Sequence, residues 1–207
     1  QSLVTYARLR PPWDEQLFAH YTQRFDLTVN RKFVRKLSGG QAAILSGSIA
    51  LASGAPLTLL DEIQAPLDVP TRYALYEEIL ALAGEVMEGQ RAPRRFIISS
   101  HMVSELEKVA EDVVVLKKSE LLAHESIDDF TCRVCALTGH ASDVERFLAA
   151  HPDLALIASR ELGPTREIVV DLRASAVGET ELATHSLTSS PCSFQDAFAY
   201  LIQENDQ

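Results

Sequence analysis

The sequence has no long apolar stretch, few cysteines and no excess of basic residues. Its apolar runs are all well short of the about 20 residues that a membrane-spanning helix needs, so any membrane role would need a partner that supplies the spans. Three cysteines, an odd number, do not suggest a disulfide framework, and a reducing compartment is the simplest interpretation. The net charge of -10 argues against general nucleic-acid binding, because acidic surfaces repel phosphate backbones.

What is present suits a folded protein of the α/β class. The chain has 207 residues, 46% of them hydrophobic, which is enough for one medium domain or two small ones. Apolar spacing, caps and breakers predict alternating helices and strands over the first part of the chain. These are helices at 13–25, 38–53, 70–87 and 103–110, strands at 57–60, 95–99, 113–116 and 121–123, and a loop at 26–36. Such alternation predicts a mostly parallel sheet with helices on its faces.

The pattern changes after about residue 129, where short strands mix with only two helices. We expect strands at 131–137, 154–159 and 168–172, helices at 142–150 and 194–202, and a loop at 174–193. This mixture predicts a small α+β domain, which could be ferredoxin-like. Cys132 and Cys135 fall on the first of these strands with an odd separation, which points them to opposite faces and argues against a shared metal.

The first candidate site is the run Ser38-Gly39-Gly40-Gln41 at a predicted helix start. Two glycines there let an anion approach the backbone, and the N–H groups and dipole of the helix favour negative charge. Glycine costs about 1 kcal/mol against alanine inside a helix, so a pair of them calls for a reason. The run therefore indicates a phosphate contact, although it could also be only a helix cap.

The second group lies where two predicted strands end. Asp61 and Glu62 follow the strand at 57–60, and His101 follows the strand at 95–99. Ligands of parallel sheets bind beyond the carboxyl ends of the strands. A carboxylate there can hold Mg²⁺ through water, an adjacent one can activate the attacking water, and a histidine can reach a phosphate.

The order and spacing of these motifs resemble those of the ABC transporter ATPases. Leu37-Ser-Gly-Gly-Gln41 resembles the signature loop and Leu57-Thr-Leu-Leu-Asp61-Glu62 the Walker B strand. Ala65-Pro-Leu-Asp68 and Ser99-Ser-His101 follow as the D-loop and the switch histidine, so the resemblance covers about residues 1–125. It implies a partial P-loop NTPase fold with a helical subdomain at 1–54, an ATPase core at 55–128 and a small, regulatory C-terminal domain at 129–207.

The resemblance also implies a mechanism, in which two ATPase domains pair head to tail around ATP and Mg²⁺. The residues Ser38 to Gln41 would contact the γ-phosphate of ATP held by the second domain. Asp61 would bind Mg²⁺ through water, Glu62 would be the general base, His101 would hold the γ-phosphate and the water, and Asp68 would lie at the dimer contact. An integral membrane permease would carry the cargo, which places such a bacterial protein in the cytoplasm at the inner face of the membrane.

One part of the family pattern is absent, and another is altered. No G-x-x-x-x-G-K-[ST] motif occurs, whereas the family has this P-loop upstream of the signature. We therefore expect these residues to be a C-terminal fragment that is inactive alone. After Glu62 the family commonly has Pro-Thr, whereas Ile63-Gln64 stands here. The alternatives are a soluble ABC ATPase of translation or DNA repair, or a non-catalytic interaction module; substrate and direction of transport are not encoded in these motifs.

Overall fold

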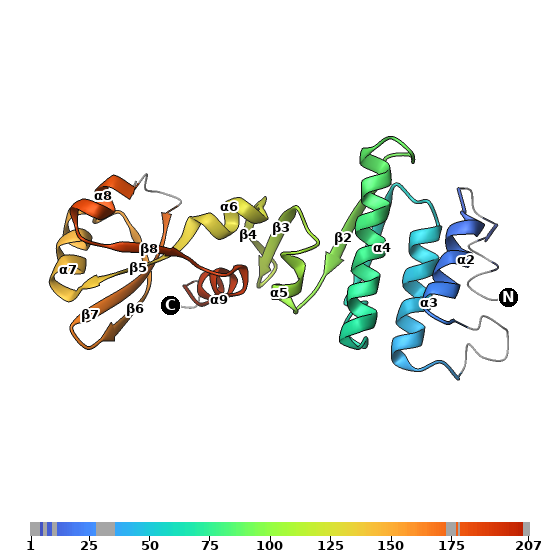
Figure 1. Ribbon diagram of the computed structural model, residues 1–207, viewed down its shortest axis with the longest axis horizontal. Helices are drawn as coiled ribbons and strands as arrows, with labels where there is room; N and C mark the ends of the chain where they lie inside the picture. Colours follow the sequence, from blue (N-terminus) through green and yellow to red (C-terminus); the bar gives the residue numbers. More distant parts are fainter. Residues whose placement is uncertain are drawn as a thin grey trace. The chain divides into compact units, whose positions relative to one another are not determined.

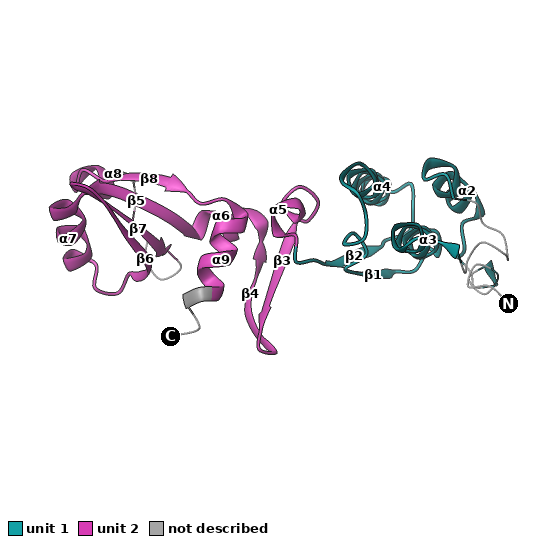
Figure 2. Cartoon of the chain, turned by 90° about the horizontal axis from the view of Figure 1, so that it is seen from below, with its two compact units in different colours: residues 1–101 teal, residues 102–207 magenta. Residues whose placement is uncertain are grey.

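A computed structural model describes residues 5, 8, 9, 12–27, 36–172, 177 and 179–204. The chain divides into two compact units, residues 1–101 and residues 102–207 (Figure 2). The predicted boundary between 128 and 129 thus falls inside the second unit. Most of the loop predicted at 26–36 lies outside the described residues.

Unit 1 consists of three described helices (Figure 1) and a pair of parallel strands (Figure 2). The elements are α2 (Glu15–Arg24), α3 (Gly39–Ala52), β1 (Leu57–Asp61), α4 (Val69–Met87) and β2 (Arg95–Ser99). The registration of β1 with β2 runs from Leu57↔Arg95 to Asp61↔Ser99, so both strands end at the same edge. The elements predicted between residues 38 and 99 are therefore present, and the parallel pairing sets the candidate residues of both strand ends side by side.

The described residues cover only one face of the β1–β2 pair. Thr58 and Leu60 are buried, whereas Leu57, Leu59 and Ile97 are 50%, 64% and 56% exposed. Parallel strands are normally buried on both faces because crossover helices cover them. The other face therefore carries apolar side chains, as a protein core does, but these side chains are exposed among the described residues.

Unit 2 contains a β-hairpin, a four-stranded antiparallel sheet and five helices among its described residues. In chain order they are α5 (Val103–Leu106), β3 (Asp112–Lys117), β4 (Glu120–Ser126), α6 (Ile127–Arg133), β5 (Val134–His140), α7 (Ala141–Ala150), β6 (Ala155–Leu162), β7 (Thr165–Asp171), α8 (Glu179–Thr184), β8 (Thr188–Pro191) and α9 (Phe194–Glu204). The sheet has the order β6-β7-β5-β8. From β5 to β8 the elements alternate as β-α-β-β-α-β, the order of the split βαβ motif.

Three secondary-structure predictions for this unit are wrong in part. The helix predicted at 103–110 ends at Leu106. The strand predicted at 131–137 begins only at Val134, because Ser126 caps α6 by accepting a hydrogen bond from the Asp129 N–H at 3.0 Å. In the stretch predicted as a loop at 174–193, the described residues form α8 and the edge strand β8. Both α8 and β8 were missed because this stretch is rich in small and polar residues. The strand β8 is defined by its pairing with β5 and has no apolar pattern of its own.

The two faces of the four-stranded sheet carry separate cores. On one face Leu137 and Ile168 pack with Phe147 of α7. On the other, Phe130 and Phe194 are packed with residues of the β3–β4 hairpin, and both are at most 1% exposed. The hairpin thus shares its core with α6 and α9, which explains why the unit begins before residue 129.

The imidazole ring of His151, the residue after α7, links this helix to α8. The ring of His151 contacts the Phe147 carbonyl through Nδ1 at 2.9 Å and the Glu181 carboxylate through Nε2 at 2.8 Å. The Phe147 carbonyl, and after it Glu181, raises the pKa of His151 above its ordinary value.

We expect this contact to stabilise the fold in acid more than in base. A raised histidine pKa contributes stability that is complete below the unfolded-state pKa of about 6.5, and that is lost as pH rises through the folded-state value. Urea unfolding of the native chain and of His151→Asn should differ more at pH 5.5 than at pH 8.5. Glu181→Gln should reduce the same difference; an equal loss at both pH values would contradict the assignment.

Candidate functional site

The residues Ser38 and Gln41 build the start of α3 with their own side chains. The Gln41 N–H donates to Ser38 Oγ at 3.2 Å, and the Ser38 N–H donates to Gln41 Oε1 at 3.0 Å. This reciprocal pair is a capping box, which satisfies two of the backbone donors that a helix start leaves free. The N–H groups of Gly39 and Gly40 precede the first intrahelical bond and are free to face an anion.

The two glycines also lie against the segment that follows β1. A Cβ atom on Gly40 would stand 3.1 Å from the Pro66 carbonyl oxygen, and one on Gly39 would stand 3.7 Å from Pro66 Cβ. The absence of side chains therefore lets α3 and the segment around Pro66 approach each other. The glycine pair has a packing role in addition to the predicted phosphate contact.

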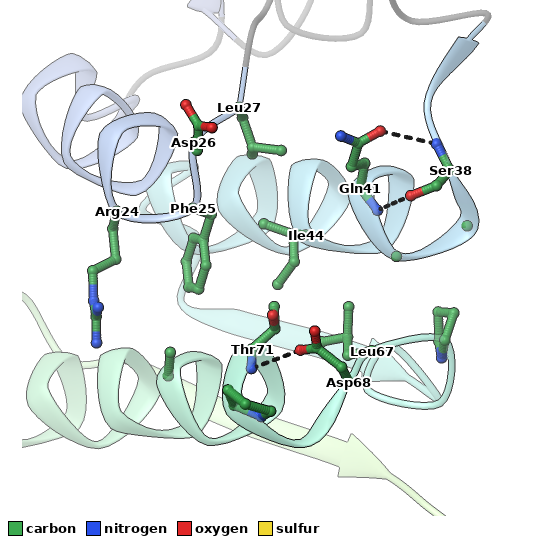
Figure 3. A pocket seen from close by; sticks show the side chains of 15 residues that line it. Arg24, Phe25, Asp26, Leu27, Ser38, Gln41, Ile44, Leu67, Asp68 and Thr71 are labelled. Atoms are coloured by element: carbon green, nitrogen blue, oxygen red, sulfur yellow. Dashed lines mark hydrogen bonds between the residues drawn. The ribbon is translucent and has the colours of Figure 1, made fainter.

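An open pocket of about 800 Å³ lies where the starts of two helices face the end of α2 (Figure 3). Its lining includes Arg24, Phe25, Ser38, Gly39, Gly40, Gln41, Asp68 and Thr71. The starts of α3 and α4 both contribute partial positive charge, which favours an anionic ligand. Asp68 caps α4 by accepting from the Thr71 N–H at 2.9 Å, and the hydrogen bonds from the Thr71 side chain and backbone lower the pKa of Asp68.

The second group of candidate residues meets at the paired ends of β1 and β2. The Ser99 hydroxyl donates to Asp61 Oδ1 at 2.5 Å, and the Glu62 N–H donates to Ser99 Oγ at 3.0 Å. Glu62 has a φ of 48°, a left-handed conformation that a residue other than glycine rarely adopts. Such strain concentrates at functional sites, because only the surrounding contacts hold it in place.

At the paired strand ends, Glu62, which follows β1, and His101, which follows β2, are in direct contact. The Nδ1 atom of His101 lies 2.8 Å from Oε2 of Glu62, and the two side chains are 70% and 41% exposed. Both are therefore accessible to a ligand. The sequence identified both residues, but it did not identify their neighbour Gln64, which is fully buried and donates to Glu62 Oε2 at 3.4 Å.

The candidate site residues thus form two groups within unit 1, one at the pocket and one at the strand ends. The described residues do not gather three or more histidine, cysteine or acidic side chains in a metal-binding arrangement. A single accessible carboxylate such as Asp61 suits Mg²⁺, which usually keeps its waters and binds through one or two carboxylates together with phosphates. Cys132 is exposed on α6 and Cys135 is buried on β5.

Comparisons with known proteins agree with the motifs. No family profile matches the sequence. An uncharacterised ABC transporter ATP-binding protein of Nostoc is 30% identical over 99 residues, which are 48% of this chain and 28% of that protein. The molybdenum import ATP-binding protein ModC of Albidiferax ferrireducens is 26% identical over 193 residues, covering 87% of this chain and 49% of ModC.

The solved structure of an ATP-binding subunit of an ABC transporter matches with a TM-score of 0.51 and 18% identity, over 62% of this chain and 53% of that one. The match confirms the predicted fold class. The chain spans about half the length of ModC and less of the Nostoc protein. Sequence and fold together identify the chain as a relative of the ABC transporter ATP-binding proteins, with the fold of part of their nucleotide-binding domain.

Proposed function

We propose that this chain forms part of an ATP-hydrolysing ABC transporter subunit and supplies its signature, Walker B and switch-histidine residues. The observation that carries the proposal is the contact of Glu62 with His101 at the end of the parallel β1–β2 pair. An accessible carboxylate held at a strained turn beside an imidazole is suited to taking a proton from an attacking water. The signature residues on α3 belong to the same unit.

Each residue of the strand-end group has a separate task in this proposal. Asp61 would hold Mg²⁺ through water, and the ion would neutralise charge on the phosphates of ATP. Ser99 orients the Asp61 carboxylate through its hydroxyl. Glu62 would accept the proton of the water, and His101, which contacts Glu62, would hold the water and the γ-phosphate.

The pocket residues act on a different nucleotide. Ser38 and the N–H groups of Gly39 and Gly40 would contact the γ-phosphate of ATP held by a second ATPase domain, with Asp68 at the contact between the domains. The P-loop of each site would come from outside these 207 residues, and the chain alone is expected to be inactive. No helix among the described residues has the length and hydrophobicity needed to cross a bilayer.

We favour transport as the process that ATP hydrolysis would drive, because the relative ModC is by name an import ATP-binding protein. We propose that a permease in the membrane carries the cargo and recruits the ATPase to the inner face. The small α+β part at the C-terminal end would be regulatory.

The role of the signature in trans can be tested with Ser38→Arg in the complete protein. The arginine would fill the space in front of α3 and remove its cap, so we expect ATP hydrolysis to fall by about 10²-fold or more. Initial ATP binding, measured by equilibrium titration, should persist, because the P-loop half of the site is unaltered.

Ser126→Arg is the matched control, since Ser126 caps α6 in the same way but outside the site. It should cost about the same stability, about 1 kcal/mol, and leave hydrolysis unchanged. If Ser38→Arg abolished initial ATP binding while Ser126→Arg did not, Ser38 would act in its own subunit's site, and the proposed head-to-tail arrangement would be wrong.

A further inference from the structure

Gln64 is the most completely buried polar side chain among the described residues, with no exposed surface. It follows Glu62 by two residues and lies beneath it. Its Nε2 group donates to Glu62 Oε2 at 3.4 Å and to the Ser99 carbonyl at 3.2 Å. One amide therefore joins the carboxylate of Glu62, the residue after β1, to the end of β2.

The orientation of this amide follows from its neighbours, and it leaves a buried acceptor. Turning the group over would set Oε1 against the Glu62 carboxylate and the Ser99 carbonyl, which are acceptors too. As it stands, Oε1 is buried and has no hydrogen-bond partner in the described structure. A buried polar atom without a partner lowers stability, and an apolar side chain of similar shape would avoid the loss.

We propose that Gln64 is a positioning residue for Glu62, which it holds in the orientation that hydrolysis requires. The proposal rests on the function proposed for Glu62. Oε2 of Glu62 then has two polar neighbours, the exposed His101 and the buried Gln64. A general base works only when it is held within hydrogen-bond reach of its proton, so an anchor below the carboxylate acts on the rate rather than on ATP affinity.

The test replaces Gln64 by methionine, which has a similar length and no donor. In the complete protein, Gln64→Met should lower kcat about 10-fold and leave the KM for ATP unchanged. In the 207-residue chain the same change should leave the urea midpoint of unfolding the same or higher, because it removes the unpartnered oxygen. A merely structural glutamine would show the reverse, with a lower midpoint and an unchanged kcat.

Gln90→Met is the matched control, because Gln90 also donates to a glutamate two residues earlier, Glu88, in an exposed turn. It should change neither kcat nor the midpoint. A second measurement does not depend on activity: the Gln64 side-chain amide signals in ¹⁵N NMR of the chain should exchange slowly and shift in Glu62→Ala.

The outcomes separate this proposal from the one on which it rests. If the complete protein hydrolyses ATP and Gln64→Met retains full kcat, or if the Gln64 signals are unmoved by Glu62→Ala, the positioning role is wrong and the proposed function stands. If the unsubstituted complete protein hydrolyses no ATP, the proposed function itself is wrong.

Discussion

Glu62→Gln in the complete protein is expected to reduce steady-state ATP hydrolysis by about 10²- to 10⁴-fold. The amide keeps the size of the side chain and can still contact His101, but it cannot accept a proton from water. ATP binding should persist, because the change leaves Asp61 and the signature residues intact. Phosphate release would report hydrolysis, and a fluorescent ATP analogue would report binding.

The control for this change is Glu88→Gln, which removes a carboxylate from the exposed turn after α4. It should leave both hydrolysis and binding as they were. Full hydrolysis in Glu62→Gln would show that another group takes the proton, and the assignment of Glu62 as the base would have to be withdrawn.

Phe130→Ala should cause a large loss of stability in unit 2. The Phe130 ring is fully buried and meets the Phe194 ring edge-on, with the ring centroids 5.2 Å apart. Removing it leaves a cavity between α6, α9 and the β3–β4 hairpin, for which we expect a loss of about 3–5 kcal/mol. Far-UV circular dichroism in urea would measure it, while the fluorescence of the single tryptophan, Trp13, follows unit 1 separately.

Leu116→Ala provides the comparison, since Leu116 is an apolar residue of the same hairpin but is 66% exposed. Its effect should stay within about 0.5 kcal/mol. If the two substitutions had similar effects, the hairpin would not share a core with α6 and α9, and the placement of the hairpin in unit 2 would be mistaken.

The parts of the structure that the sequence predicted are those with strong local signals. The capping serine of α3, the proline in the first turn of α4 and the short apolar strands ending at Asp61 and Ser99 each have one dominant interpretation. The candidate residues of the strand ends were predictable for the same reason, because parallel strands bring their carboxyl ends to one edge.

What the sequence did not reveal depends on contacts between distant residues. The edge strand β8 is held by pairing with β5, and its own residues are polar. The burial of Gln64 depends on where Ser99 lies after a long crossover, although its departure from the usual Pro-Thr was visible. A glutamine after two acidic residues resembles an ordinary loop residue until the fold places it under one of them.

The capping box of α3 affects how such motifs can be interpreted in general. Ser38 and Gln41 would be favoured at this position by any helix that starts here, whether or not a nucleotide ever binds. During evolution, a chain that lost catalysis could keep this part of the motif for folding alone. A glutamate is not a residue that the left-handed backbone at position 62 favours, so Glu62 points to hydrolysis more strongly than the capping residues of the signature do.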